Sequence, residues 1–311
     1  MQNLTQIKNA HHFTHVAMAT LFDLIIVHEN KDYAQQAAWE AVKEIDRLEN
    51  ELSRFKPNSD ISRINNLKIG ERIILGADAF NCIRRSIELH KETYGAFNIA
   101  CSALLKCWLN PDYTLKNPTD DEIELAIKKS CIENLVLHHE DYSIEILEVG
   151  TMIDLGAFGK GYAVDAVTEI LSDWNISCTL LSAGRSSIRA IGAPPDSSGW
   201  QISISNPFDN QQILKTFLLK NVSVGASGLS KGSHIINTLT GKPEVKKAGS
   251  WVFAQNTADA DALSTALMIL NDEEVSKIIK EDISAIVVND DTSGNLLFEE
   301  FGALPPTSSV A

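Results

Sequence analysis

The sequence predicts an α+β protein in which mixed sheets are flanked by helices. Short apolar segments rich in β-branched residues are interspersed with amphipathic helical stretches. Their order follows neither a regular strand-helix-strand alternation nor an uninterrupted series of hairpins. With 311 residues and a hydrophobic fraction of 44%, the chain can bury the core of one domain with two lobes. We expect that domain at residues 16–304, between flexible segments at 1–15 and 305–311.

The first elements follow from hydrophobic periodicity. Residues 21–27 form a short apolar run and are expected to be a strand. Residues 34–52 place apolar side chains at three- and four-residue steps, which predicts an amphipathic helix. Thr119 and Glu122 have the spacing of a capping box, so a further helix is expected to begin there.

Polar residues and glycines predict the next helix and the elements in the middle of the chain. Asp78 is expected to cap a helix that ends before Gly95 and directs Tyr94 inward. Residues 142–153 are expected to form a strand, and residues 163–171 an amphipathic helix after a glycine-rich turn. Further strands are expected at residues 179–181, 200–205, 213–219 and 251–253.

Charge and cysteine usage exclude several classes of protein. The chain has 27 Lys and Arg residues against 41 Asp and Glu residues, a formal charge of −14. This acidity excludes a nucleic-acid-binding surface, because such a surface needs a basic face. None of the five cysteines forms a Cys-x-x-Cys motif, so we expect reduced thiols. No transmembrane segment and no secretory leader are recognised, which predicts a cytoplasmic protein, or a periplasmic one if a leader has been trimmed.

The strongest local signal is the segment Ile-Asp-Leu-Gly-Ala-Phe-Gly-Lys-Gly-Tyr-Ala-Val-Asp at residues 153–165. Three glycines in six residues let the backbone approach a ligand closely. The start of a helix would add free N–H groups and a positive dipole end, and Lys160 would add a charge suited to phosphate. Asp154 could accept a hydrogen bond from a ring N–H. A glycine-rich turn with a solvated lysine is an equally acceptable interpretation of this segment alone.

A second signal lies at residues 258–270, where a helix is expected from Asp261 to Leu270. Asp261 and Thr265 are four residues apart, so they share a helix face. Their oxygens are hard donors of the kind that Mg²⁺ binds, although an acidic first turn that complements the helix dipole is the commoner explanation. Asp259 could serve as the helix cap.

Two weaker signals complete the set. His234 lies two residues after Gly232 and precedes two apolar residues, where it could move a proton near neutral pH or could be purely structural. Phe97 lies in a tight turn after the predicted second helix and could line a pocket for an aromatic ring, or belong to the core.

Taken together and in this order, these segments resemble the ApbE family of FAD:protein FMN transferases. The matches extend from Met18-Ala19-Thr20, through the loop at residues 51–65, to Asp261 and Thr265. The segments at 153–165 and 260–270 are most similar to the family pattern. The resemblance implies an ApbE-like, T-fold-related architecture with a ligand cleft between lobes.

The resemblance also implies roles for individual residues. Asp154 would contact the flavin, and Lys160 a phosphate or adenosine part of FAD. Mg²⁺ would be bound by Asp261, Thr265 and the backbone carbonyl of Ala157. The other residues that would contact the flavin are Met18, Phe55, Ala96, Phe97, Asn98 and Ile235. His234 matches the histidine implicated in transfer.

Several positions depart from the family pattern. Ala19 stands where the family has glycine, and Asn98 where it has aspartate. Arg185 and Ser186 replace a glycine and an aspartate, and Asn237 replaces the aspartate of an Asp-Pro pair. The metal and lysine positions are intact.

The implied reaction transfers FMN from FAD to a Ser or Thr of an acceptor protein and releases AMP. His234 or Asp261 would help to deprotonate the acceptor hydroxyl, and we favour Asp261 as metal ligand instead. The resemblance suggests a redox-pump or reductase subunit as acceptor. An FAD pyrophosphatase, in which water replaces the acceptor, and a non-catalytic FAD-binding protein remain alternatives.

Overall fold

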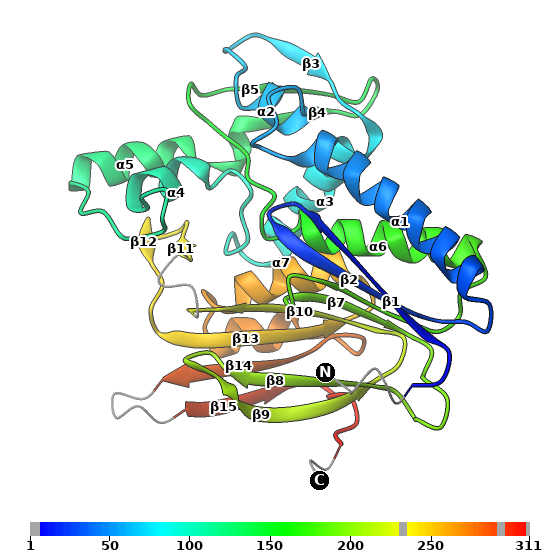
Figure 1. Ribbon diagram of the computed structural model, residues 1–311. Coiled ribbons are helices and arrows are strands. Elements are labelled where there is room, and N and C mark those ends of the chain that lie inside the picture. The colour runs from blue at the N-terminus through cyan, green and yellow to red at the C-terminus, as the bar shows by residue number, and fades with distance from the viewer. Residues whose placement is uncertain (1–6, 230–234, 291–295, 309–311) are drawn as a thin grey trace.

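An eight-stranded antiparallel sheet organises the protein (Figure 1). This computed structural model describes residues 7–229, 235–290 and 296–308. In spatial order, the strands of the sheet are β1 (Ala10–Ala17), β2 (Thr20–Val27), β6 (Thr179–Ala183), β7 (Ser187–Ile191), β10 (Val222–Gly228), β13 (Lys247–Ala254), β14 (Ser284–Asp290) and β15 (Leu296–Phe301).

Smaller sheets and helices surround this sheet. A three-stranded sheet has the order β3 (Arg72–Ile74), β5 (Ser143–Ile146) and β4 (Leu135–His138). Two hairpins pair β8 (Trp200–Asn206) with β9 (Asp209–Leu219) and β11 (Ile236–Asn237) with β12 (Lys242–Pro243). The helices are α1 (Lys31–Leu52), α2 (Asp60–Ile64), α3 (Ala77–Glu92), α4 (Ser102–Trp108), α5 (Asp120–Lys129), the 3₁₀ turn Ile132–Asn134, α6 (Gly159–Asp173), α7 (Thr257–Leu267) and α8 (Asp272–Ile278). The α+β class with flanking helices is confirmed. Within the described residues, no helix has the length and apolar character that crossing a bilayer requires.

Side chains point alternately to the two faces of the large sheet, so an apolar layer forms on each face. Leu24 and Ile26 of β2 pack into the core that includes α1, α6 and α7. Ile25, between them, packs into a second core with the β8–β9 hairpin, including Trp200 and Phe217. Successive side chains of a strand point to opposite faces, so one strand serves both layers. Figure 1 shows the helices on one side of the sheet and β8–β9 on the other.

Two expectations about α3 are wrong. The helix begins after Gly76, which acts as N-cap, so Asp78 lies inside the first turn and bonds other elements: its Oδ1 accepts from the Tyr162 hydroxyl at 2.6 Å. Tyr94 has φ of +52° and is half exposed, because the chain has already left the helix there. The capping box of α5, in contrast, is confirmed: Thr119 accepts from the Glu122 N–H and Glu122 accepts from the Thr119 N–H.

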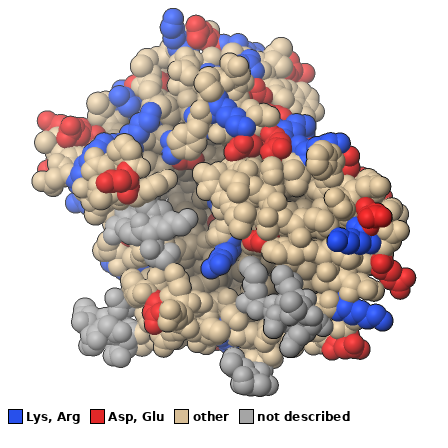
Figure 2. Space-filling model, viewed as in Figure 1, with Lys and Arg blue, Asp and Glu red and all other residues tan. Residues whose placement is uncertain are grey.

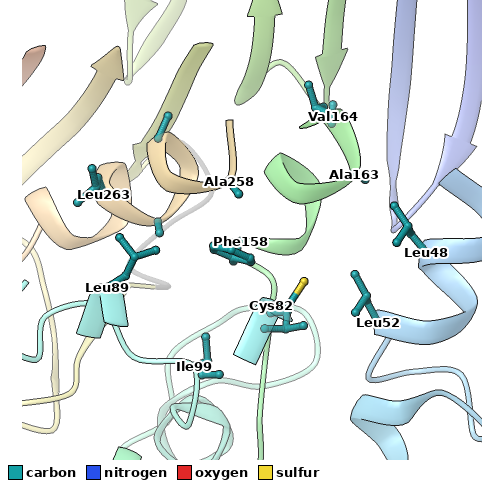
Figure 3. Packing of buried hydrophobic residues seen from close by; sticks show 14 of the residues in the cluster. Leu48, Leu52, Cys82, Leu89, Ile99, Phe158, Ala163, Val164, Ala258 and Leu263 are labelled. Atoms are coloured by element: carbon teal, nitrogen blue, oxygen red, sulfur yellow. The ribbon is translucent and has the colours of Figure 1, made fainter. Parts of the chain in front are cut away.

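The helices that carry the two strongest motifs both begin earlier than their apolar periodicity indicates. Helix α6 begins at Gly159 instead of Ala163, so Gly159 and Gly161 are helical and are not part of the turn. Helix α7 begins at Thr257 instead of Asp261. Figure 3 shows the core at this place, where the Phe158 ring lies between Ala258 of α7 and the side chains of Cys82 and Ile99.

All five cysteines are free, as expected.

Candidate functional site

The site is built where the first turns of α6 and α7 meet. A Cβ atom at Gly161 would lie 2.5 Å from the carbonyl oxygen of Thr257 and 2.7 Å from Ala258, closer than side chains come. Glycine at this position therefore lets the two helix backbones touch. Asp165, one turn further along α6, accepts hydrogen bonds from the N–H groups of Thr257 and Ala258 at 2.8 and 2.9 Å.

Asp165 therefore does the capping that was expected of Asp259. Its carboxylate satisfies two of the free N–H groups at the start of α7 and lies at the positive end of the helix dipole. Burial raises the pKa of Asp165, and the bonds from the two N–H groups oppose this rise. Asp259 instead pairs with Arg85, whose guanidinium lies 2.8 Å away. A cap supplied from another helix cannot be recognised from the sequence near α7.

On its other side, α7 packs against β10. A Cβ at Gly225 of β10 would lie 2.1 Å from the carbonyl of Ala260, so glycine again permits direct backbone contact. Ser227, two residues along β10, contacts the Thr265 hydroxyl at 3.0 Å. Helix α7 is thus held between α6 and β10, which places Asp261 and Thr265 with little freedom.

Lys160 and Asp261 come together at this contact. The Lys160 Nζ lies 3.4 Å from Asp261 Oδ2 and donates a hydrogen bond of 2.5 Å to the carbonyl oxygen of Gly156. Asp261 is only 3% exposed, and its Oδ2 makes no hydrogen bond within the described part of the chain. Burying a carboxylate oxygen without a hydrogen bond is costly, and the Lys160 ammonium 3.4 Å away offsets part of this cost.

The donors near Asp261 fit Mg²⁺. The Thr265 hydroxyl lies 3.5 Å from the backbone carbonyl of Asp261, one turn further along the same face of α7. Ala157 precedes α6 in the turn that also contains Gly156, the acceptor for Lys160. Among the described residues no group of three His, Cys, Asp or Glu side chains could hold a metal. One carboxylate with neutral oxygens matches the few protein ligands that Mg²⁺ takes beside phosphate oxygens and water.

Asp154 lies at the start of the glycine turn and is held by local contacts. Its Oδ1 accepts from the Gly156 N–H at 2.8 Å, and its Oδ2 pairs with the Arg54 Nε at 3.0 Å. The Arg54 guanidinium also lies over the ring of Phe55, 4.2 Å from its centroid. Phe55 is 72% exposed, so its ring is open to a planar ligand. Arg54, which the sequence reasoning did not select, therefore joins two of the predicted flavin residues.

The other predicted flavin residues are less accessible. Ala96 and Phe97 are buried in the core, and Ile235 is buried beside β11. The Asn98 side chain bonds within the protein: its amide donates to the Ser130 carbonyl at 2.8 Å and its oxygen accepts from the Ala100 N–H at 2.8 Å. Their flavin contacts stay predictions. His234 lies outside the described residues.

Three of the residues that differ from the family pattern lie in turns between strands, where the backbone conformation explains their surroundings. Met18 and Ala19 join β1 to β2 with φ of +49° and +56°, as a two-residue turn with two left-handed residues requires. Ala19 therefore keeps the conformation for which glycine is better suited. Arg185 also has a positive φ, +64°, and lies exposed at the tip between β6 and β7. Asn237 accepts from the N–H groups of Leu239 and Thr240, so its amide oxygen shapes the β11–β12 turn.

The model of the ApbE family matches residues 18–287 of this sequence. The chain belongs to the ApbE family. The match begins at the β1–β2 tip and ends in β14, so it includes both helices of the site.

Curated relatives of this family member are distant in sequence. The FAD:protein FMN transferase of Escherichia coli K12 is 23% identical over 251 residues, covering 76% of this chain and 71% of that protein. The FAD:protein FMN transferase of Buchnera aphidicola is 26% identical over 266 residues, covering 79% and 76%.

Solved structures share the fold. The flavin transferase ApbE from Vibrio cholerae superposes with a TM-score of 0.82 at 21% identity and covers 96% of this chain and 97% of its own. The apo form of the Pseudomonas stutzeri flavinyl transferase ApbE gives 0.82 at 24% identity, with 94% of each chain covered. The ApbE-like architecture is confirmed.

Proposed function

We propose that this protein is a Mg²⁺-dependent FAD:protein FMN transferase. Membership of the ApbE family and the names of the curated relatives support this activity. The structural observation that carries it is the approach of Lys160 to Asp261, whose buried Oδ2 makes no hydrogen bond in the described part of the chain. A lysine and a buried carboxylate near the starts of two helices suit a metal-bound diphosphate.

The reaction breaks the phosphoanhydride bond between the two phosphates of FAD and forms a phosphoester bond to the acceptor. An acceptor Ser or Thr oxygen attacks the FMN phosphorus, the P–O bond to the AMP phosphate breaks, and the hydroxyl proton passes to a base. His234 is the predicted base, since Asp261 is assigned to the metal. Mg²⁺, held by Asp261, Thr265 and the Ala157 carbonyl, would supply charge neutralisation for the diphosphate.

The protein's own groups bind and orient FAD. Lys160 contributes a positive charge next to the glycine turn. The first turn of α6 has no side-chain cap, and its N–H groups after Gly159, which itself donates to the Leu155 carbonyl, can face a phosphate. Phe55 offers an exposed ring on which the isoalloxazine can stack, and Arg54 and Asp154 border it. Together these groups hold the phosphorus in line for attack.

The decisive assay mixes the protein with FAD, Mg²⁺ and a flavin-acceptor domain, and follows AMP release and covalent FMN. We expect both products from the unaltered chain and neither from Asp261→Ala. Asp259→Asn is the matched control, because this acidic residue lies on the same helix and pairs with Arg85 instead. AMP without labelled protein would favour a pyrophosphatase, and retained FAD without AMP a binding protein. Unchanged activity in Asp261→Ala would disprove the metal assignment.

The acceptor is expected to be a redox-pump or reductase subunit with a Ser or Thr site. The cytoplasm stays the predicted compartment.

A further inference from the structure

A groove beside the lobe formed by α4 and α5 is unusually basic for so acidic a protein. The groove encloses about 470 Å³, within the size range of ligand sites. Three lysines, Lys106, Lys116 and Lys129, line it, against one carboxylate, Glu122. The chain as a whole has a formal charge of −14. Figure 2 shows both blue and red side chains over this lobe, on the left of the view, so the excess of lysine belongs to the lining of the groove and not to the whole lobe.

The three ammonium groups lie within the groove lining and lack carboxylate partners among the described residues. Lys106 Nζ donates to the thioether sulfur of Met152 at 3.1 Å, a weak acceptor. Lys116 Nζ donates to the backbone carbonyl of Lys106 at 2.7 Å. The Lys129 ammonium lies over Gly150, where a Cβ would be 3.4 Å from it.

The single acidic residue of the groove is already engaged. Glu122 accepts from both the N–H and the hydroxyl of Thr119 in the capping box, and these bonds, together with the charge of Lys116, lower its pKa. It therefore stays ionised and offsets part of the Lys116 charge, while the capping bonds hold it at the start of α5 and away from the other two lysines. The positive charge of the groove is left to attract an anionic partner.

Both walls of the groove continue into the candidate site. On one wall, Met152 is two residues before Asp154, which pairs with Arg54. On the other wall, Ala103 follows the segment whose Ile99 carbonyl accepts from the Asp154 N–H at 2.8 Å. An extended chain in the groove would therefore lead toward Asp154 and the glycine turn.

We propose that this groove binds an acidic, extended segment of the acceptor protein next to its Ser or Thr site. The proposal rests on the transferase function and specifies how the acceptor is recognised. Carboxylates of the segment would pair with Lys106 and Lys129 at the rim, and an apolar side chain would contact Leu125 and Met152. Charge at the rim would mainly increase the association rate with the acceptor and favour acidic partners over others.

The test measures binding of short fluorescent peptides by anisotropy, independently of catalysis. One peptide alternates Asp with Leu around a single Thr, and a second has Lys in place of Asp. We expect the unaltered protein to bind the acidic peptide only, and less tightly as salt increases. Lys106→Glu combined with Lys129→Glu should weaken binding about tenfold or more, about 1.4 kcal/mol.

The matched control reverses two lysines elsewhere on the surface. Lys43→Glu with Lys277→Glu makes the same change in net charge, and these lysines pair with Glu40 and Glu273 on other helices. The control should bind the peptide as the unaltered protein does. Equal loss in both double variants, or equal binding of both peptides, would overturn the proposal. Displacement of the peptide by millimolar phosphate at constant ionic strength would also overturn it, in favour of a small-anion site.

Binding of FAD, measured by flavin fluorescence, separates this proposal from the transferase function. The groove variants should bind FAD normally while the KM for an acceptor protein increases. Failure of the unaltered protein to bind FAD would contradict the transferase function alone. Normal transfer by the Lys106→Glu, Lys129→Glu variant, with an unchanged KM for the acceptor, would contradict the groove proposal alone.

Discussion

Replacing Gly161 by alanine tests whether the contact between α6 and α7 builds the site. The new Cβ would lie 2.5 Å from the Thr257 carbonyl oxygen, whereas ordinary contact begins near 3.4 Å. The nearest atoms are backbone, so no side chain can move aside and the helices must separate by about 0.9 Å. Overpacking of this kind costs about 1–3 kcal/mol, partly offset by the better helix propensity of alanine, about 1 kcal/mol.

The matched control is Gly159→Ala, two residues earlier on the same helix. Its Cβ would meet only Leu155 Cβ at 3.6 Å, an ordinary contact. We therefore expect Gly159→Ala to be neutral or slightly stabilising. The gain in helix propensity is common to both variants, so Gly161→Ala should have a free energy of unfolding about 1–3 kcal/mol lower than the control, which for a domain of this size lowers Tm by roughly 2–5 °C.

The same displacement should impair ligand binding. Lys160 and Asp261 belong to the two helices that would move apart, and their charged atoms are now 3.4 Å apart. A further 0.9 Å would take them beyond ion-pair distance, so FAD and Mg²⁺ binding should weaken in Gly161→Ala. Gly159→Ala serves as the control for stability alone, because Gly159 belongs to the turn proposed to face the phosphate. Denaturant unfolding and flavin-fluorescence titration measure the two effects. If Gly161→Ala is as stable as Gly159→Ala and binds FAD as tightly as the unaltered protein, the helix contact does not position the site.

Three other substitutions, one of them with a control variant, address single groups. Asp261→Asn should abolish the increase in Tm that Mg²⁺ produces in the unaltered protein, because only Mg²⁺ bound to the folded state stabilises it; an undiminished increase would contradict the assignment. Asp165→Asn leaves one oxygen for two N–H donors and should lower the free energy of unfolding by about 1–3 kcal/mol at neutral pH. Burial raises the pKa of Asp165, so the folded protein binds more protons than the unfolded chain from about pH 4 up to that raised pKa. This carboxyl therefore makes stability fall as pH increases through that window, and Asp165→Asn should remove that component in denaturant titrations between about pH 4 and 7. Phe55→Ala should weaken FAD binding about tenfold with little change in Tm, since the ring is 72% exposed, and Trp39→Ala, at a ring 64% exposed on α1, should leave FAD binding unchanged.

Local patterns in the sequence determined much of this protein. The spacing of Thr119 and Glu122 predicted a capping box that the structure contains, because such a box involves only neighbouring residues. The four-residue step from Asp261 to Thr265 placed both on one face of a helix, and the order of the motifs identified the family. These inferences hold because helix periodicity and turn chemistry act within a few residues.

The tertiary structure alone decided how the site is assembled. The start of α6 at Gly159 and the capping of α7 by Asp165 depend on a contact between helices nearly a hundred residues apart. The exposure of Tyr94 and the pairing of Arg54 with Asp154 likewise follow from packing. The physical reason is that a glycine such as Gly161 reveals its purpose only when another backbone lies against it, and short-range periodicity does not encode which backbone that is.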